Sequence, residues 1–246
     1  MADATNEQVM VALLAGGRGT RLRPLTTVFP KPLVPLGDKP VLEILLRQLA
    51  AHHFQRVVLS TGHLSELLMA VVGDGRKYGV DVSYCHEEQP LGTAGPLALL
   101  RGRLTEPFLV MNGDLLTTLS FSRLLAFHRQ QQADATIAVY RREVKIDFGL
   151  IDSTPDGAFS GYREKPTYQF EVSMGVYAMN RSVLSHVPDG ERLDMPDLIA
   201  RVHAAGGRVA CYREDCYWLD IGRMDDYARA QEQFEENAGL FLGPGA

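Results

Sequence analysis

The chain has 246 residues, of which 46% are hydrophobic and 22% charged, and its formal net charge at pH 7 is −5. This length suits one large α/β domain, and an acidic balance argues against nonspecific binding to nucleic acid or to a membrane surface, which needs a basic face. No apolar run is long enough to cross a bilayer, and the N-terminus lacks the basic and apolar regions of a secretion signal.

The first half of the chain alternates apolar β-type runs with segments of helical period. Strands are predicted at 9–14, 56–61, 80–85, 108–111 and 135–140, and helices at 41–51 and 121–132. In the 41–51 helix the leucines share one face. This alternation predicts a mostly parallel sheet covered by helices on both faces, with ligands bound beyond the carboxyl ends of the strands.

The second half is more interrupted. Strands at 148–151, 159–162 and 173–179, separated by turns such as Pro155-Asp156-Gly157, predict an antiparallel edge or a small separate sheet. Helices are expected at 181–186, 194–205 and 223–237. Residues 1–238 are predicted to form a single domain, and residues 239–246 a flexible tail.

The three cysteines, Cys85, Cys211 and Cys216, match neither CxxC nor a Cys/His zinc spacing. An odd number of cysteines without a secretion signal predicts reduced thiols and a cytoplasmic location.

The most informative segment is LAGGRGTRLRPLTTVFPKPLVPL, from Leu14 to Leu36. The first strand ends in Gly16-Gly17-Arg18-Gly19-Thr20, where glycine lets backbone N–H groups converge on anionic oxygens. Arg21 follows at once, and Lys31 lies beyond a segment stiffened by prolines. Two fixed cations beside a ring of amides predict a ligand with several phosphates. The segment matches neither GxxxxGK[ST] nor GxGxxG, since Leu22 stands at the third glycine position.

GGRGTRLRPLT and PKPLVP resemble, without a gap, the signature of the sugar-1-phosphate nucleotidyltransferase family, GGxGTRLxPLT followed by PKPLxP. The resemblance runs from Val11 to about Glu236. It implies a Rossmann-like three-layer α/β sandwich with a mostly parallel mixed sheet and a small antiparallel subsheet on the acceptor side. The implied activity joins a nucleoside triphosphate to a sugar-1-phosphate, giving an NDP-sugar and pyrophosphate. Many members continue into a hexapeptide β-helix, which is not seen here, and a homo-oligomer remains possible.

In this reaction an ionised phosphate oxygen attacks the α-phosphorus, so no strong general base is needed. Catalysis would consist of positioning and of neutralising crowded negative charge by cations and Mg²⁺. Asp114 follows an apolar strand and the corner Asn112-Gly113, and Asp220 lies in YWLDIG, which resembles the family's W-x-D-x-G. Taken alone, each aspartate could cap a helix. Taken together, the resemblance makes them the Mg²⁺ ligands.

By the same resemblance, Arg21 contacts the β- and γ-phosphates and Lys31 the α-phosphate. Glu164-Lys165-Pro166 matches the family's EKP, so Lys165 would hold the sugar phosphate and Glu164 would accept hydrogen bonds from sugar hydroxyls. Gly149 and Gly175 lie where the family brings backbone close to the sugar. The residues expected to bind the nucleotide are Leu14, Ala15, Gly16, Gly17, Gly19, Thr20, Glu87, Pro90, Gly92, Thr93, Asn112 and Gly113.

The resemblance also implies that the nucleotide base is read around residues 87–95, EEQPLGTAG. Thymidylyl enzymes commonly have Gln five residues before the equivalent of Gly92, whereas this chain has Glu87. A carboxylate only accepts hydrogen bonds, and guanine offers two adjacent donors, so GTP is the favoured donor. Uracil's single N3–H also satisfies Glu87, so a UTP- or dTTP-dependent enzyme is the alternative. Solvent exposure of Glu87 or Glu88 without a role is a further reading.

Two rivals come from other classes. A non-catalytic NDP-sugar-binding regulatory subunit on the same fold could lose Arg21, Lys31 or either aspartate, and all four are present. A sugar-nucleotide-dependent glycosyltransferase predicts a DxD motif, which Asn112-Gly113-Asp114 lacks.

Overall fold

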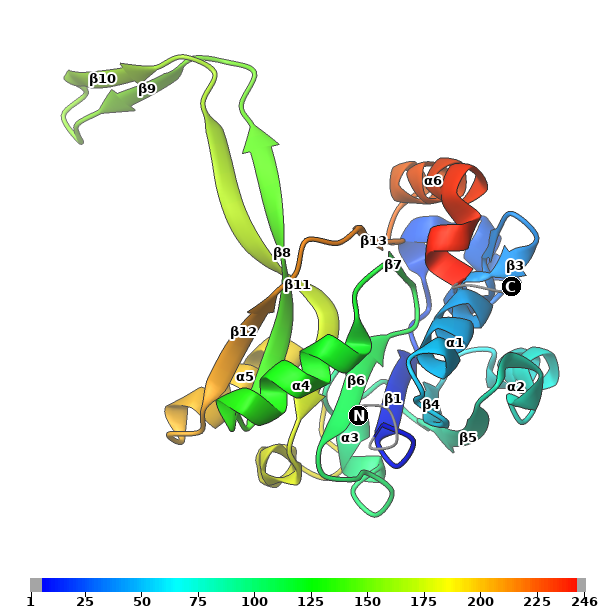
Figure 1. The fold of residues 1–246 in the computed structure, drawn as a ribbon. Coiled ribbons are helices and arrows are strands. Elements are labelled where there is room, and N and C mark those ends of the chain that lie inside the picture. Colours follow the sequence, from blue (N-terminus) through cyan, green and yellow to red (C-terminus); the bar gives the residue numbers. More distant parts are fainter. Residues whose placement is uncertain (1–5, 243–246) are drawn as a thin grey trace.

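The computed structural model describes residues 6–242, and its centre is a seven-stranded sheet of order β12-β8-β11-β6-β1-β4-β5 (Figure 1). Neighbouring strands are parallel except β11, which is antiparallel to both β8 and β6. The strands are β1 (Met10–Ala15), β4 (Arg56–Thr61), β5 (Asp81–His86), β6 (Phe108–Asn112), β8 (Ala135–Lys145), β11 (Thr167–Met179) and β12 (Val209–Arg213).

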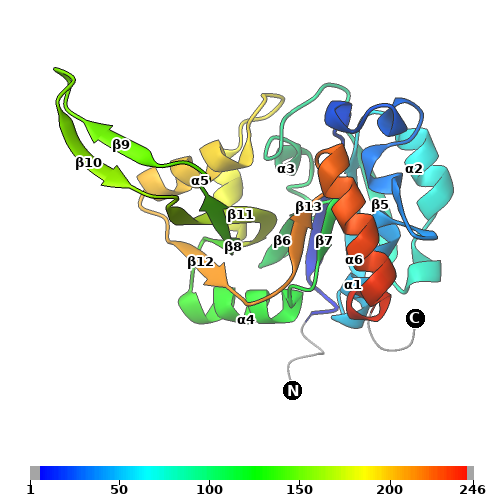
Figure 2. The ribbon, with the colours of Figure 1, turned by 90° about the horizontal axis from the view of Figure 1, so that it is seen from above.

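Helices cover both faces of this sheet. They are α1 (Val41–Ala51), α2 (Ser65–Val72), α3 (Pro96–Leu99), α4 (Phe121–Gln131), α5 (Met195–Ala204) and α6 (Met224–Leu242). Val11 and Leu13 of β1 face a core shared with α1, α2 and α4, whereas Met10 and Ala12 face a core shared with α3 and α5. This is the period-two alternation of a strand buried on both sides. Figure 2 shows α1 and α4 on one side of the sheet and α3 and α5 on the other.

The expected α/β architecture, with a mostly parallel mixed sheet and a small antiparallel sheet, is confirmed. The helix at 41–51 and the strand at 56–61 have the predicted bounds, and the segment at 181–186 is a 3₁₀ helix. One placement differs, because β11 lies inside the central sheet rather than at its edge. A flexible tail is expected from residue 239, whereas helix α6 extends to residue 242. Residues 239–242 continue α6, and Phe241 is buried against Tyr217 and Phe234. Residues 243–246 lie outside the described part.

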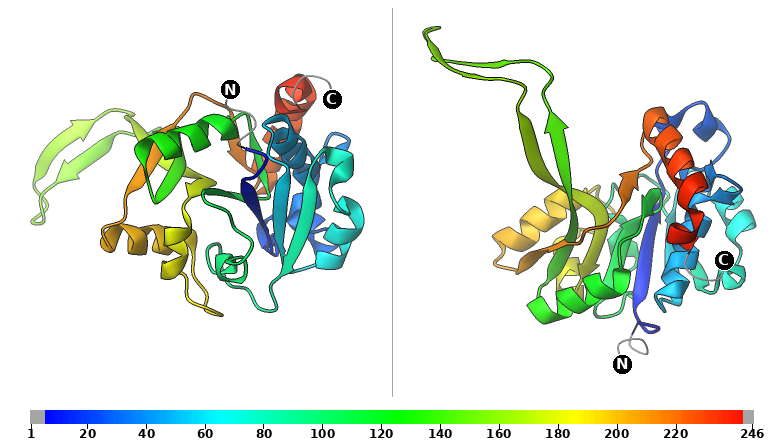
Figure 3. Two further views of the ribbon diagram at one scale, coloured as in Figure 1. Left: turned by 60° about the horizontal axis from the view of Figure 1, so that its bottom comes forward. Right: turned by 45° about the horizontal axis from the view of Figure 1, so that its top comes forward.

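A long two-stranded ribbon leaves the sheet on the side of β8 and β11. Both strands exceed their predicted lengths, and residues 140–145 pair with residues 167–172 beyond the last contacts with β12 and β6. The ribbon carries a hairpin of β9 (Leu150–Ser153) and β10 (Phe159–Arg163) at its end. Residues 140–172 are called the arm. Figures 1 and 3 show the arm standing clear of the helices.

Two short sheets complete the fold. β2 (Pro35–Leu36) pairs with β3 (Lys39–Pro40), and β7 (Leu115–Thr117) pairs antiparallel with β13 (Trp218–Asp220). The second pairing joins segments about a hundred residues apart just beyond β6. Among residues 6–242, none of the helices combines the length and apolarity that crossing a membrane requires.

Candidate active site

The glycine-rich turn follows the carboxyl end of β1, which lies between β6 and β4 in the sheet. Gly19 has a φ of 59°, and the Thr26 hydroxyl donates a hydrogen bond of 2.7 Å to the Gly19 carbonyl. A Cβ on Gly19 would lie 2.8 Å from a methyl carbon of Thr26. Both the backbone conformation and the space therefore require glycine here.

Arg21 lies in a 3₁₀ helix, Thr20–Leu22, directly after this turn. Leu22 is fully buried in a core shared with α6, whereas Arg21 is exposed and makes no ion pair with any residue between 6 and 242. The buried leucine fixes the turn, and the guanidinium is left available to a ligand.

A cavity of about 420 Å³ opens over this turn. All but five of the site residues expected from the sequence line it. Those that line it are Leu14, Ala15, Gly16, Gly17, Gly19, Thr20, Arg21, Lys31, Glu87, Pro90, Gly92, Thr93, Asn112, Asp114 and Asp220. Gly113 does not line the cavity, but its N–H donates a hydrogen bond to the Leu14 carbonyl at 3.0 Å, which holds β1 and the β6–β7 corner together.

The pairing of β7 with β13 places the two expected metal ligands side by side. Asp220 is in register with Leu115, and the Ile221 N–H donates to the Asp114 carbonyl at 3.1 Å. Lys31, whose side chain is 12% exposed, forms an ion pair with Asp114, and its Nζ lies 3.8 Å from Asp220 Oδ1. Three residues separated by up to 189 positions thus form one charged cluster.

This cluster has the donor set of a divalent cation site. Asp114 Oδ1 and Asp220 Oδ1 are both buried and have no hydrogen-bond partner among the described residues. Burial raises the pKa of Asp220, the negative charge of Asp114 raises it further, and Lys31 and Arg21 oppose both effects. Two unsatisfied hard oxygens suit a divalent cation that keeps waters and takes substrate phosphates as its other ligands. No group of three or more His, Cys, Asp or Glu residues suited to a metal occurs within residues 6–242.

Glu87 is held in one orientation at the cavity wall. The Ser60 hydroxyl donates to one carboxylate oxygen at 2.9 Å, and the Leu91 N–H donates to the other at 3.3 Å. Burial raises the pKa of Glu87, and these two hydrogen bonds lower it. A Cβ on Gly16 would lie 2.7 Å from the carboxylate, so Glu87 adjoins the glycine-rich turn. Each carboxylate oxygen keeps a lone pair for a ligand.

The sequence did not predict Arg192 and Asp194, which also line the cavity. Leu193 exchanges backbone hydrogen bonds with the 91–95 loop, accepting from Ala94 and donating to Leu91, both at 2.9 Å. Asp194 accepts a hydrogen bond from the Thr93 N–H, and Arg192 lies 3.3 Å from Asp194. These contacts join segments a hundred residues apart, and GERLD carries no motif that could have indicated them.

Of the four residues expected at the acceptor sugar, one lies beside the cavity and three lie in the arm. Gly175 has a φ of 71°, and a Cβ there would lie 2.5 Å from the Asn112 amide, so its backbone adjoins the cavity wall. Gly149, Glu164 and Lys165 belong to the arm, where Tyr162 donates a hydrogen bond to Glu164 at 2.9 Å. The side chains of Glu164 and Lys165 are 61% and 58% exposed, and none of these three residues lines the cavity.

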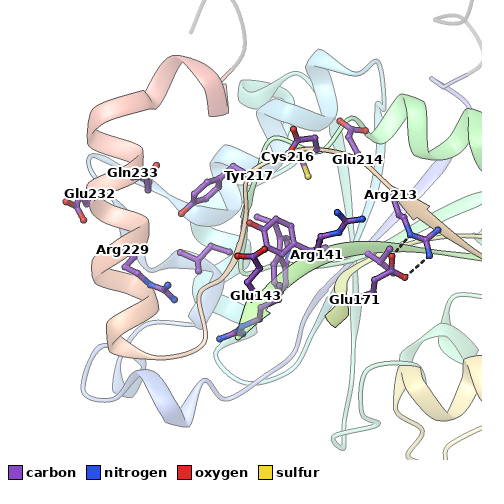
Figure 4. A pocket seen from close by; sticks show the side chains of 16 residues that line it. Arg141, Glu143, Glu171, Arg213, Glu214, Cys216, Tyr217, Arg229, Glu232 and Gln233 are labelled. Atoms are coloured by element: carbon purple, nitrogen blue, oxygen red, sulfur yellow. Dashed lines mark hydrogen bonds and ion pairs between the residues drawn. The ribbon is translucent and has the colours of Figure 1, made fainter. Parts of the chain in front are cut away.

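A second hollow, of about 1140 Å³, lies between the base of the arm and α6 (Figure 4). Arg141, Glu143 and Glu171 reach it from the arm, and Arg229 and Glu232 from α6. The ring of Trp218 forms part of it and stacks at a tilt on Tyr140, with ring centroids 5.3 Å apart. Because Trp218 is two residues from Asp220 on β13, the hollow adjoins the carboxylate cluster.

Comparison with known proteins agrees with this geometry. The sequence profile described as nucleotidyl transferase matches residues 10–237. The chain is 34% identical to the mannose-1-phosphate guanylyltransferase of Mycobacterium tuberculosis, over 90% of this chain and 63% of that protein. It is 30% identical to the UTP–glucose-1-phosphate uridylyltransferase of Synechocystis, over 89% of this chain and 61% of that protein. The chain thus spans a little under two thirds of the length of these relatives.

A solved structure of HddC from Yersinia pseudotuberculosis, complexed with GMP-PN, has the same fold. Its TM-score is 0.72 at 24% sequence identity, over 92% of this chain and 99% of that one.

Proposed function

Because the chain belongs to the nucleotidyl transferase family, we propose that it transfers a nucleotidyl group from a nucleoside triphosphate, preferably GTP, to a sugar-1-phosphate. The observation that carries this proposal is the cluster of Lys31, Asp114 and Asp220 beside the glycine-rich turn. It combines a nearly buried cation with two carboxylates, each of which has one buried oxygen without a hydrogen-bond partner among the described residues. Phosphoryl-group chemistry uses cations and carboxylates that can hold a metal, and unpartnered oxygens on two neighbouring buried carboxylates are uncommon in a purely structural ion pair.

In the proposed reaction, a phosphate oxygen of the sugar-1-phosphate attacks the α-phosphorus. The new P–O bond forms as the bond from the α-phosphorus to the bridging oxygen breaks, and pyrophosphate leaves with that electron pair. The nucleophile is already ionised, so no protein group has to remove a proton. Lys31 stabilises charge at the α-phosphate, and Arg21 neutralises the leaving pyrophosphate.

Asp114 and Asp220 would hold a divalent cation, for which we propose Mg²⁺. When bound, the cation neutralises phosphate charge and orients the triphosphate. The amides of the glycine-rich turn bind the triphosphate from the opposite side. Arg192 also lines the cavity, where it pairs with Asp194 and supplies a third cation for a phosphate group.

Glu87 supports the choice of GTP. Its carboxylate is oriented by Ser60 and Leu91 and can accept hydrogen bonds from two adjacent donors, which guanine presents and uracil does not. The guanylyltransferase relative points the same way. Glu164 and Lys165 remain the proposed acceptor residues, although the arm holds them outside the cavity of their own chain.

The test is release of pyrophosphate, with Mg²⁺ present, from each of GTP, UTP, dTTP, CTP and ATP against a panel of sugar-1-phosphates. GTP with a hexose- or heptose-1-phosphate is expected to give the highest kcat/KM. A higher kcat/KM with UTP or dTTP would support the proposed enzyme class but contradict the proposed preference for GTP. No release with any pair, together with binding of NDP-sugars, would replace the proposal by the regulatory-subunit reading.

A further inference from the structure

The arm leaves much apolar surface in water. It carries half of the large hydrophobic side chains that are exposed within residues 6–242, namely Val144, Phe148, Ile151, Phe159, Tyr162 and Phe170. Phe148 is 78% exposed and Phe159 68%. Since one aromatic side chain can bury 150–250 Å², this set exposes on the order of 500 Å². A monomer rarely leaves a larger apolar patch, and a standard interface buries roughly 800 Å² on each partner.

The backbone of the arm is open as well. Within the described residues, β9 and β10 pair only with each other, and residues 140–145 and 167–172 pair only across the ribbon. A two-stranded ribbon is marginally stable without something packed on it, and its unpaired edges are sites for pairing with another chain. The arm therefore leaves both an apolar face and unpaired strand edges that a second chain could cover.

The charges of the arm fit a copy of itself. Residues 140–172 hold five Lys or Arg and six Asp or Glu, interspersed along the sequence. A strongly acidic or basic partner would meet as much repulsion as attraction on such a surface. In a two-fold dimer each segment meets its counterpart in the reverse sense, so a mixed surface can match itself.

The arm points away from the cavity of its own chain. The ribbon extends about 20 Å beyond the sheet, at roughly 3.3 Å per residue. Figures 1, 2 and 3 all show the β9–β10 hairpin directed away from α6 and from the glycine-rich turn. Glu164 and Lys165 at the base of this hairpin consequently face solvent in a single chain.

The hollow at the base of the arm is a suitable binding site for the arm of a second copy. Its volume of about 1140 Å³ can take several side chains, its lining includes the rings of Tyr140 and Trp218, and its walls carry both signs of charge. Trp218 and Asp220 are on the same face of β13, because strand side chains alternate. A hairpin seated in this hollow would bring its lysine next to the carboxylate cluster.

We propose that two copies of this chain exchange arms, so that the arm of each fills the hollow of the other and Lys165 of one copy completes the acceptor side of the other copy's cavity. This inference rests on the proposed function, because it assigns Lys165 to the sugar phosphate. It predicts a dimer whose two sites are each built from both chains.

The experiment is complementation between two impaired variants of the full chain. Lys31→Ala removes a cation of the cavity, Lys165→Ala removes the cation of the arm, and each alone is expected to lose roughly 10-fold or more of kcat/KM. Co-expressed with different tags, they form heterodimers in which one cavity has both lysines. If pairing is random, the mixed preparation regains about a quarter of the wild-type activity, since half of the dimers carry one intact site.

Three outcomes would overturn the inference. A dimer or a monomer that is active but shows no complementation would mean that the arm serves its own chain. Full activity of Lys165→Ala alone would mean that the arm contributes nothing to the site. A monomeric mass for the wild type in light scattering, at the concentration of the activity assay, would remove the second copy.

A second variant tests the contact itself. Phe148→Ser combined with Phe159→Ser is expected to convert the dimer to a monomer in light scattering, with unchanged circular dichroism. Val28→Ser, at an exposed apolar residue outside the arm, is the matched control and should stay dimeric. If the wild type releases no pyrophosphate with any substrate pair, the proposed function fails. The light-scattering masses then still test whether the arms hold two copies together. A double variant that remains dimeric would contradict the proposed exchange of arms.

Discussion

Residues 14–36 fold as a series of short turns from which several leucines reach the core, whereas residues 140–172 extend from the sheet with large apolar side chains in water. Leu22, Leu33 and Leu36 anchor the first segment, each no more than 7% exposed. Within residues 6–242 the arm has no such buried leucine, and it depends on the β8–β11 and β9–β10 ladders and on the ion pair between Glu171 and Arg213. Packing against the body fixes the groups of the first segment around the cavity proposed to hold the triphosphate, while the groups of the arm would be fixed by the contact proposed with a second copy.

The largest effect is expected at the cluster fixed by the body. Asp114→Asn should lower kcat by roughly 10³-fold, because one of two carboxylates for the cation is lost. The free energy of unfolding should change by less than about 2 kcal/mol, since the carboxylate adds little packing. Pyrophosphate release and urea unfolding measure the two effects. The matched control is Asp38→Asn, an exposed carboxylate beside Lys39. Wild-type turnover in Asp114→Asn would remove the metal assignment.

The contrast in anchoring predicts a contrast in stability. Leu22→Ala should lower the free energy of unfolding by about 2–4 kcal/mol, because it leaves a cavity in a closed core. Phe159→Ala, in the arm, should change it by less than about 0.5 kcal/mol in dilute solution. Chemical denaturation of both variants tests the difference. Equal losses would show that the arm is packed as tightly as the body.

A smaller effect is expected at Glu87, the residue proposed to select the nucleotide base. Glu87→Gln should lower the GTP:UTP ratio of kcat/KM by roughly 10-fold, because an amide presents a donor where guanine needs a second acceptor. Glu88→Gln, at the exposed neighbouring residue, is the control. An unchanged ratio in Glu87→Gln would take this residue out of base selection.

The smallest effect concerns a buried polar contact where the arm's strand enters the body. His128 of α4 is hydrogen-bonded to Thr136 of β8 at 2.9 Å and to Asn180 at 3.1 Å, and burial lowers its pKa. The unfolded chain therefore binds more protons than the folded one as the pH falls below about 6.5, so His128 costs stability there. Between pH 6.5 and 5, the free energy of unfolding should fall more steeply in the wild type than in His128→Gln. Equal slopes, with His203→Gln as an exposed control, would contradict this.

Local pattern predicted α1 and β4, and a contiguous motif predicted the glycine-rich turn. The family resemblance predicted most of the residues that line the cavity. The length of β8 could not be predicted. Arg141, Arg142 and Lys145 break the apolar pattern of a buried strand, and only pairing with residues 167–172 shows that the strand continues. Arg192 was missed for a related reason, since its position depends on backbone contacts between Leu193 and a loop a hundred residues earlier.

The contacts between the 91–95 loop and residues 193–195 couple two segments that both line the cavity. Leu91, Ala94 and Gly95 bond to the backbone of Leu193, while Thr93 bonds to Asp194 and Met195. A change that moves the 91–95 loop therefore also moves the neighbouring Arg192. On the proposed function, base preference and the position of Arg192 are then coupled, and grafting residues 87–95 from a relative with another base preference should succeed only when residues 191–195 are transplanted with them.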